Sequence, residues 1–96
     1  MTREEILRVL SSHRADLERF GVKSLALFGS AARDDARAES DVDLLVEFEQ
    51  PVGLFEFVDL KDFLESVLGC PVDLGTPQSL KPRLRERVLS EAVHVP

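Results

Sequence analysis

Two strand-like segments, separated by a stretch of small and polar residues, constrain the fold of this chain most. The first segment is residues 22–28, and its second half, residues 25–28, is apolar at every position, which is typical of a strand that is covered on both faces. Residues 42–48 alternate, so that Val42, Leu44, Val46 and Phe48 share one face and the acidic positions share the other. Between them, residues 29–40 contain no apolar side chain larger than alanine. This stretch therefore predicts a loop with room for one helical turn.

The remaining segments predict helices on either side of these strands. The capping box Thr2-x-x-Glu5 begins a helix over about residues 3–20. A helix over residues 54–68 has apolar positions near one face, namely Leu54, Phe57, Leu60, Leu64 and Val67. A third strand follows at residues 72–74, then a last helix to about residue 92 and a short edge strand at 93–95.

The expected fold is α/β, a small mixed β-sheet with helices packed against it, in the order α-β-α-β-α-β-α. Because a helix joins them, strands 42–48 and 72–74 should run parallel. The length of 96 residues indicates one domain over residues 1–96.

The charge of the chain is concentrated in its middle. The net charge is -6, and residues 25–76 hold 3 basic against 12 acidic groups, or -9. This balance argues against nonspecific nucleic-acid binding, which needs a basic surface. The single cysteine, Cys70, forms no internal disulfide, and no Cys/His spacing predicts a zinc site. No apolar run is as long as a membrane span of about 18 residues, and no signal peptide is recognised, so we expect a cytoplasmic protein.

Three acidic residues form the first candidate site. Asp41 and Asp43 lie two positions apart, so their carboxylates share a face about 7 Å apart. The pair fits either a solvated strand start or a site for a hard cation such as Mg²⁺. Asp73 is the only acid of strand 72–74, and it can stand beside Asp43 if the two strands are parallel neighbours. Converging carboxylates are costly unless a cation neutralises them, and a two-metal site would do so.

Gly29-Ser30 is the second candidate feature. A glycine after a strand lets the backbone approach a ligand closely, and N–H groups at a helix start favour phosphate. Alone, the pair is most often only a turn. Next to a metal cluster it implies phosphoryl or nucleotidyl transfer. Glu47 competes with Asp73 as the third acid, but it lies about two residues too far along the strand.

These motifs resemble a known family. Gly29-Ser30, ten intervening residues and Asp41-x-Asp43 resemble the signature of the DNA polymerase β-like nucleotidyltransferase superfamily. The longer matches, over residues 28–33 and 40–44, resemble its minimal nucleotidyltransferase (MNT) subgroup, in which Ser40 shapes the turn before the acids. The resemblance implies a polymerase β palm-like core. Members are commonly encoded beside a HEPN-domain partner, as antitoxin to a HEPN ribonuclease toxin.

The resemblance also implies roles for the acids. Asp41 and Asp43 would bind Mg²⁺, with Asp43 bridging two ions. Asp73 would complete the second metal site and help to deprotonate the acceptor hydroxyl. The reaction would transfer a nucleoside monophosphate, with ATP as the usual donor, to a tyrosine of the HEPN partner.

The phosphates of ATP would be held by Gly29, Ser30 and Arg33. Arg33 matches the arginine of the subgroup and suits phosphate, or it forms an ion pair with Asp34 or Asp35.

Several alternatives remain open at this point. The chain is an enzyme that modifies a partner protein, or a non-catalytic module that neutralises a HEPN-type partner by occlusion, or a sensor of nucleotide or metal. Arg83, Arg85 and Arg87 form a solvated face of the last helix, or contact the nucleotide, an acidic partner or RNA. Phe55 and Val58, if they face outward, form a patch for a homodimer or for a partner.

Overall fold

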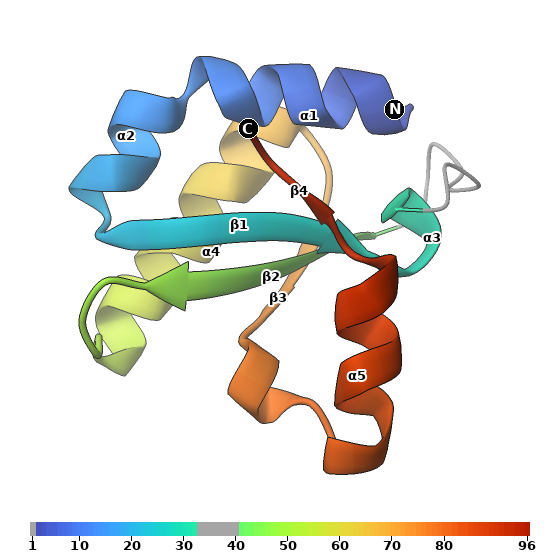
Figure 1. The fold of residues 1–96 in the computed structure, drawn as a ribbon. Helices are drawn as coiled ribbons and strands as arrows, with labels where there is room; N and C mark the ends of the chain where they lie inside the picture. Colours follow the sequence, from blue (N-terminus) through green and yellow to red (C-terminus); the bar gives the residue numbers. More distant parts are fainter. Residues whose placement is uncertain (1, 33–40) are drawn as a thin grey trace.

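The computed structural model describes residues 2–32 and 41–96. Within them, four strands form one mixed sheet in the order β3-β2-β1-β4 (Figure 1). The strands are β1 (Val22–Phe28), β2 (Val42–Phe48), β3 (Val72–Gly75) and β4 (Val93–His94). β1 is antiparallel to both β2 and β4, and β2 is parallel to β3. The predicted central strand, parallel pair and short edge strand are therefore confirmed.

The helices are α1 (Arg3–Ser12), α2 (Arg14–Arg19), α3 (Gly29–Ala32), α4 (Leu54–Leu68) and α5 (Pro82–Glu91), with a 3₁₀ turn, η1 (Pro77–Ser79). The prediction of one helix over residues 3–20 is wrong, because the helix breaks at His13. The His13 ring Nδ1 donates to the Val9 carbonyl (2.9 Å), while the His13 backbone N–H turns to Leu10 (3.1 Å). The side chain thus replaces a backbone bond of the helix. The ring also packs edge-on against Phe63.

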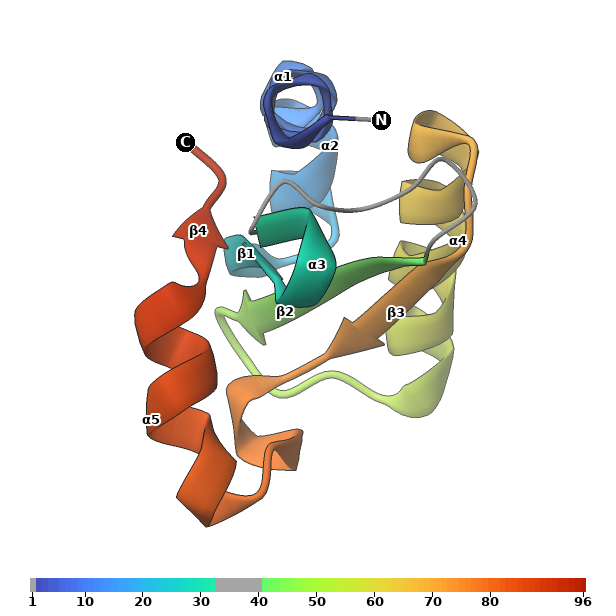
Figure 2. The same cartoon turned by 90° about the vertical axis from the view of Figure 1, so that its right-hand side faces the viewer.

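The main core lies between one face of the sheet and the helices α1, α2 and α4 (Figure 2). Ile6 and Leu10 of α1 and Leu60 and Leu64 of α4 are almost completely buried there. Leu54 was expected on the apolar face of its helix, but its side chain is 74% exposed. It is the first residue of α4, and Cα–Cβ bonds of a helix tilt toward its N-terminus. Its side chain therefore points off the end of the helix.

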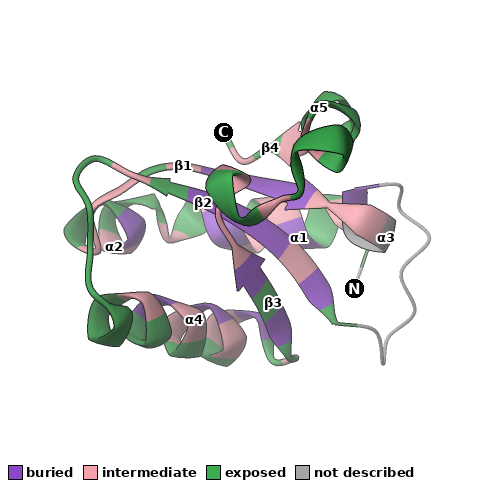
Figure 3. Cartoon of the chain, turned by 90° about the horizontal axis from the view of Figure 1, so that it is seen from below, coloured by how far each residue is buried: buried purple, intermediate pink, exposed green. Residues whose placement is uncertain are grey.

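The opposite face of the sheet is covered only in part. Asp43, Leu45 and Glu47 of β2 point to this side, because Val42, Leu44 and Val46 fill the core. Seen from this side, α5 lies over β1 and β4 and not over β3 (Figure 3). No helix in the described part of the chain is long and apolar enough to cross a membrane.

The cap of α1 allows a first prediction. Thr2 Oγ1 accepts a hydrogen bond from the Glu5 backbone N–H (3.2 Å) and donates to Glu5 Oε1 (3.2 Å). Replacement of Thr2 by alanine should lower the free energy of unfolding by about 1 kcal/mol, because one N–H at the helix start loses its partner. Urea denaturation measures this change. Thr2→Ser keeps the hydroxyl and should unfold at nearly the same urea concentration; an equal loss in both variants would contradict the capping role.

Candidate active site

Gly29 lies directly against Asp43. The antiparallel register pairs Phe28 with Asp43, so the next residue of the chain turns over the Asp43 side chain. Gly29 has a φ of +66°, and a Cβ there would overlap Oδ2 of Asp43 and stand 3.3 Å from its Cγ. Both the backbone conformation and the space therefore require glycine. The prediction that Gly29 faces the first acidic residues is confirmed for Asp43.

Asp43 and Asp73 form a register pair of the parallel strands β2 and β3. Paired residues of neighbouring strands point to the same face, with the strands about 4.8 Å apart. The predicted juxtaposition of these two acids is confirmed. Asp43 is half-buried, whereas Asp73 is exposed. Asp41 is also exposed and stands directly before β2, where Val42 N–H donates to the Pro71 carbonyl (3.0 Å).

The carboxylate oxygens of Asp43 and Asp73 suit a hard cation. In residues 2–32 and 41–96, no group of three or more His, Cys, Asp or Glu side chains converges closely enough to hold a metal ion by itself. Carboxylates of like charge favour such separation. Mg²⁺, however, is usually bound by one or two carboxylates together with substrate phosphates. The oxygen ligands of Asp43 and Asp73 fit a site of that kind, which the substrate completes.

The other predicted residues are placed as follows. The backbone of Ser30 belongs to α3, the short helix that Gly29 begins. Arg33 and Ser40 lie outside the described residues. Glu47 is exposed and pairs with Ser24, so it does not stand beside Asp73 as a third acid.

Two further features lie near the site: a hydrogen bond and a hollow. Arg3 Nη1 of α1 donates to the Ala32 carbonyl at the end of α3 (3.0 Å). This bond ties the helix that follows Gly29 to the N-terminal helix. In addition, a hollow of about 230 Å³ lies between Gly29 and one face of α5. The last helix therefore borders the site, and contact of its arginines with the nucleotide was one of the alternatives left open by the sequence.

The three arginines of α5 lie in different surroundings. Arg85 Nε donates to the Pro77 carbonyl (3.0 Å), and its Nη2 donates to the Leu80 carbonyl (3.3 Å). Arg85 therefore fastens the turn before α5. Arg87 borders the hollow beside Gly29, whereas Arg83 is exposed and is not part of that lining.

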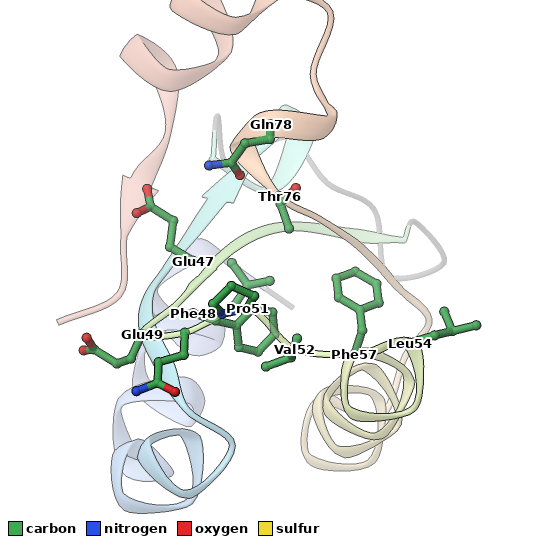
Figure 4. Close-up of a pocket in the computed structure, with 12 residues that line it drawn as sticks. Glu47, Phe48, Glu49, Pro51, Val52, Leu54, Phe57, Thr76 and Gln78 are labelled. Carbon is green, nitrogen blue, oxygen red and sulfur yellow. The ribbon is translucent and has the colours of Figure 1, made fainter.

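A larger cavity of about 560 Å³ lies at the other end of β2 (Figure 4). Its walls are apolar side chains of β2, of the β2–α4 connection and of α4, namely Phe48, Pro51, Val52, Leu54 and Phe57. Figure 4 shows Thr76 and Gln78 across from them. Glu47 borders it four residues after Asp43, or about 13 Å along the strand. The cavity is thus large enough for a small ligand but separate from the acids.

Cys70 lies near the start of β2 and β3. Burial raises the pKa of its thiol above the ordinary value, and the negative charges of Asp41 and Glu65 add to this rise against the opposing charge of the N-terminus. The thiol is therefore protonated at neutral pH. Its half-buried side chain packs against the core, in agreement with the packing role expected of a lone cysteine.

Comparison with known proteins agrees with this geometry. Residues 10–95 match the family model of the nucleotidyltransferase domain. The chain is 45% identical to the protein adenylyltransferase MntA of Thermococcus cleftensis, over 99% of this chain and 97% of that protein.

Solved structures share the fold. A chain provisionally described as a minimal nucleotidyltransferase superposes with a TM-score of 0.82 at 42% identity, covering 97% of this chain and 95% of that one. A toxin–antitoxin complex with AMP-PNP has the same fold, with a TM-score of 0.70 at 23% identity, over 88% of this chain and 71% of that one. The chain therefore belongs to the nucleotidyltransferase domain family, as a member similar to the protein adenylyltransferases.

Proposed function

We propose that the chain transfers AMP from ATP to a hydroxyl group of a partner protein. The register of Asp43 opposite Asp73, with Gly29 packed against Asp43, carries this proposal. It brings two carboxylates to one face of the sheet, and Asp73 is exposed there to a substrate. The identity to a protein adenylyltransferase supports the choice of reaction.

In this proposal Asp41, Asp43 and Asp73 would hold two Mg²⁺ ions, and Asp43 would serve both. Bound Mg²⁺ offsets the charge of carboxylates and phosphates and polarises the phosphate under attack. Asp43 and Asp73 are already adjacent, so little rearrangement of the backbone is needed. Asp41 contributes from the residue before β2.

The chain's own residues then orient the reactants. The Gly29 backbone, the Ser30 hydroxyl and Arg33 hold the β- and γ-phosphates of ATP. The acceptor hydroxyl forms a bond to the α-phosphorus, its proton passes to a carboxylate oxygen of Asp73, and the bond to pyrophosphate breaks. Asp73 suits this role because it is exposed beside Asp43 and therefore accessible to an acceptor from outside the chain.

The partner in this proposal is a HEPN-domain toxin, and the chain is its antitoxin. An exposed apolar patch at the start of α4 supports a protein partner: Leu54, Phe55 and Val58 are 74%, 83% and 41% exposed. Contiguous exposed apolar side chains mark interaction surfaces. A second copy of this chain could instead bind this patch. Measurement of the size of the protein in solution, with and without the partner, distinguishes the two. The free thiol of Cys70 agrees with action in the reducing cytoplasm.

Label transfer tests this proposal. The protein is incubated with ATP labelled at the α-phosphate, Mg²⁺ and the product of its neighbouring gene, the proposed HEPN-domain partner. We expect label on the partner, complete loss of transfer with EDTA, and recovery when Mg²⁺ is returned in excess. An unlabelled partner in the presence of Mg²⁺, or transfer that continues in EDTA, would contradict the proposal.

Neutralisation by occlusion is the second candidate, favoured by the exposed apolar patch on α4. It predicts that the double variant Asp41→Asn/Asp43→Asn still protects cells from the partner. The enzymatic proposal predicts loss of protection, although the variant still binds. Growth of cells that express both proteins separates the two functions.

A further inference from the structure

The hollow between Gly29 and α5 has a distinct lining. Besides Phe28 and Gly29 it is bordered by four residues of α5, namely Leu84, Arg87, Val88 and Glu91. These positions follow the spacing i, i+3, i+4 and i+7, so they form one stripe of the helix. The hollow, of about 230 Å³, is smaller than pockets that enclose a whole small molecule. It is of a size for one part of a ligand.

Among the described residues that line this hollow, Arg87 is the one cation. Its Nε lies 3.7 Å from Glu91 Oε1, and both side chains are well exposed, at 78% and 46%. Exposed pairs of this kind are weak. A guanidinium carries five N–H donors, so the contact with Glu91 engages one edge of the group. The pair is therefore easily exchanged for a stronger one.

From this geometry we infer that Arg87 binds the phosphate tail of the donor nucleotide. This inference rests on the proposed function and adds to it a residue from the last helix. Gly29 belongs both to the hollow and to the contact with Asp43, so a phosphate chain at the acids lies next to Arg87. The planar guanidinium binds two phosphate oxygens at once. Glu91, on the same stripe, competes with the phosphate for Arg87.

Nucleotide binding tests the inference. Affinities for AMP and AMP-PNP are measured in Mg²⁺ by calorimetry on the full chain. Arg87→Ala should weaken AMP-PNP binding about tenfold or more, because a charge-assisted hydrogen bond is lost, and should change AMP binding less than twofold. Arg87→Lys, which keeps the charge but not the planar fork, should fall between. Glu91→Gln should strengthen AMP-PNP binding, because the competing carboxylate is gone.

Arg83→Ala is the matched control, since Arg83 is an exposed arginine of the same helix outside the hollow. It should leave the preference for AMP-PNP over AMP unchanged. An unchanged affinity in Arg87→Ala, or an equal loss in Arg83→Ala, overturns the inference while the proposed function stands. If the unaltered chain binds no AMP-PNP at all, the proposed function and the inference both fail.

Discussion

Replacement of Asp43 by asparagine should lower the rate of AMP transfer by about a thousandfold or more. Asparagine keeps the size of the side chain but removes its negative charge. Loss of one preorganised group that stabilises transition-state charge already costs about 10²–10³ in rate, and Asp43 is proposed to serve both metal ions. Its register partner Asp73 remains in place, so the effect isolates a single carboxylate. Initial rates of label transfer measure it.

Glu47→Gln provides the matched control for this substitution. Glu47 lies on the same strand and the same face as Asp43, four residues further on, and the change also removes one negative charge. Its rate of transfer should stay within about twofold of the unaltered chain, because charges about 13 Å apart at a surface are largely screened. Equal rate losses in the two variants would mean that net charge, rather than the position of Asp43, controls the reaction.

Much of the fold follows from local patterns in the sequence. The alternation of residues 42–48 fixes which side of β2 is buried, because a strand exposes alternate residues to opposite faces. The helix between β2 and β3 favours a parallel arrangement of these strands, as in a βαβ unit. In each strand the second residue is an aspartate, and the register pairs these two positions. The neighbourhood of Asp43 and Asp73 was therefore predictable.

The break in the first helix and the different places of the α5 arginines depend on contacts between distant segments. The break at His13 arises where its ring contacts Phe63 of α4, a contact that helical periodicity does not record. Arg85 and Arg87 look alike in the sequence, yet the first binds backbone carbonyls before α5 and the second borders Gly29. Which arginine reaches the site depends on how α5 returns to β1.

Replacement of Gly29 by alanine should reduce AMP transfer about a hundredfold or more and also lower stability. A left-handed backbone costs a non-glycine residue roughly 1–2 kcal/mol. The added Cβ would also overlap Oδ2 of Asp43, so the carboxylate must move. A displacement of about 1 Å in a catalytic group is enough to cost about a hundredfold in rate. Rates and urea denaturation are measured on the same preparations.

Gly21→Ala and Gly69→Ala separate the two effects of this substitution. Both glycines have positive φ values, +80° and +71°, and a Cβ at either would meet nothing within 4 Å. These variants should lose stability by an amount similar to Gly29→Ala but keep most of the transfer rate. If they lost activity equally, backbone strain alone would explain the loss at Gly29. A selective loss at Gly29 would instead mean that close approach to Asp43 is what the reaction requires of this glycine.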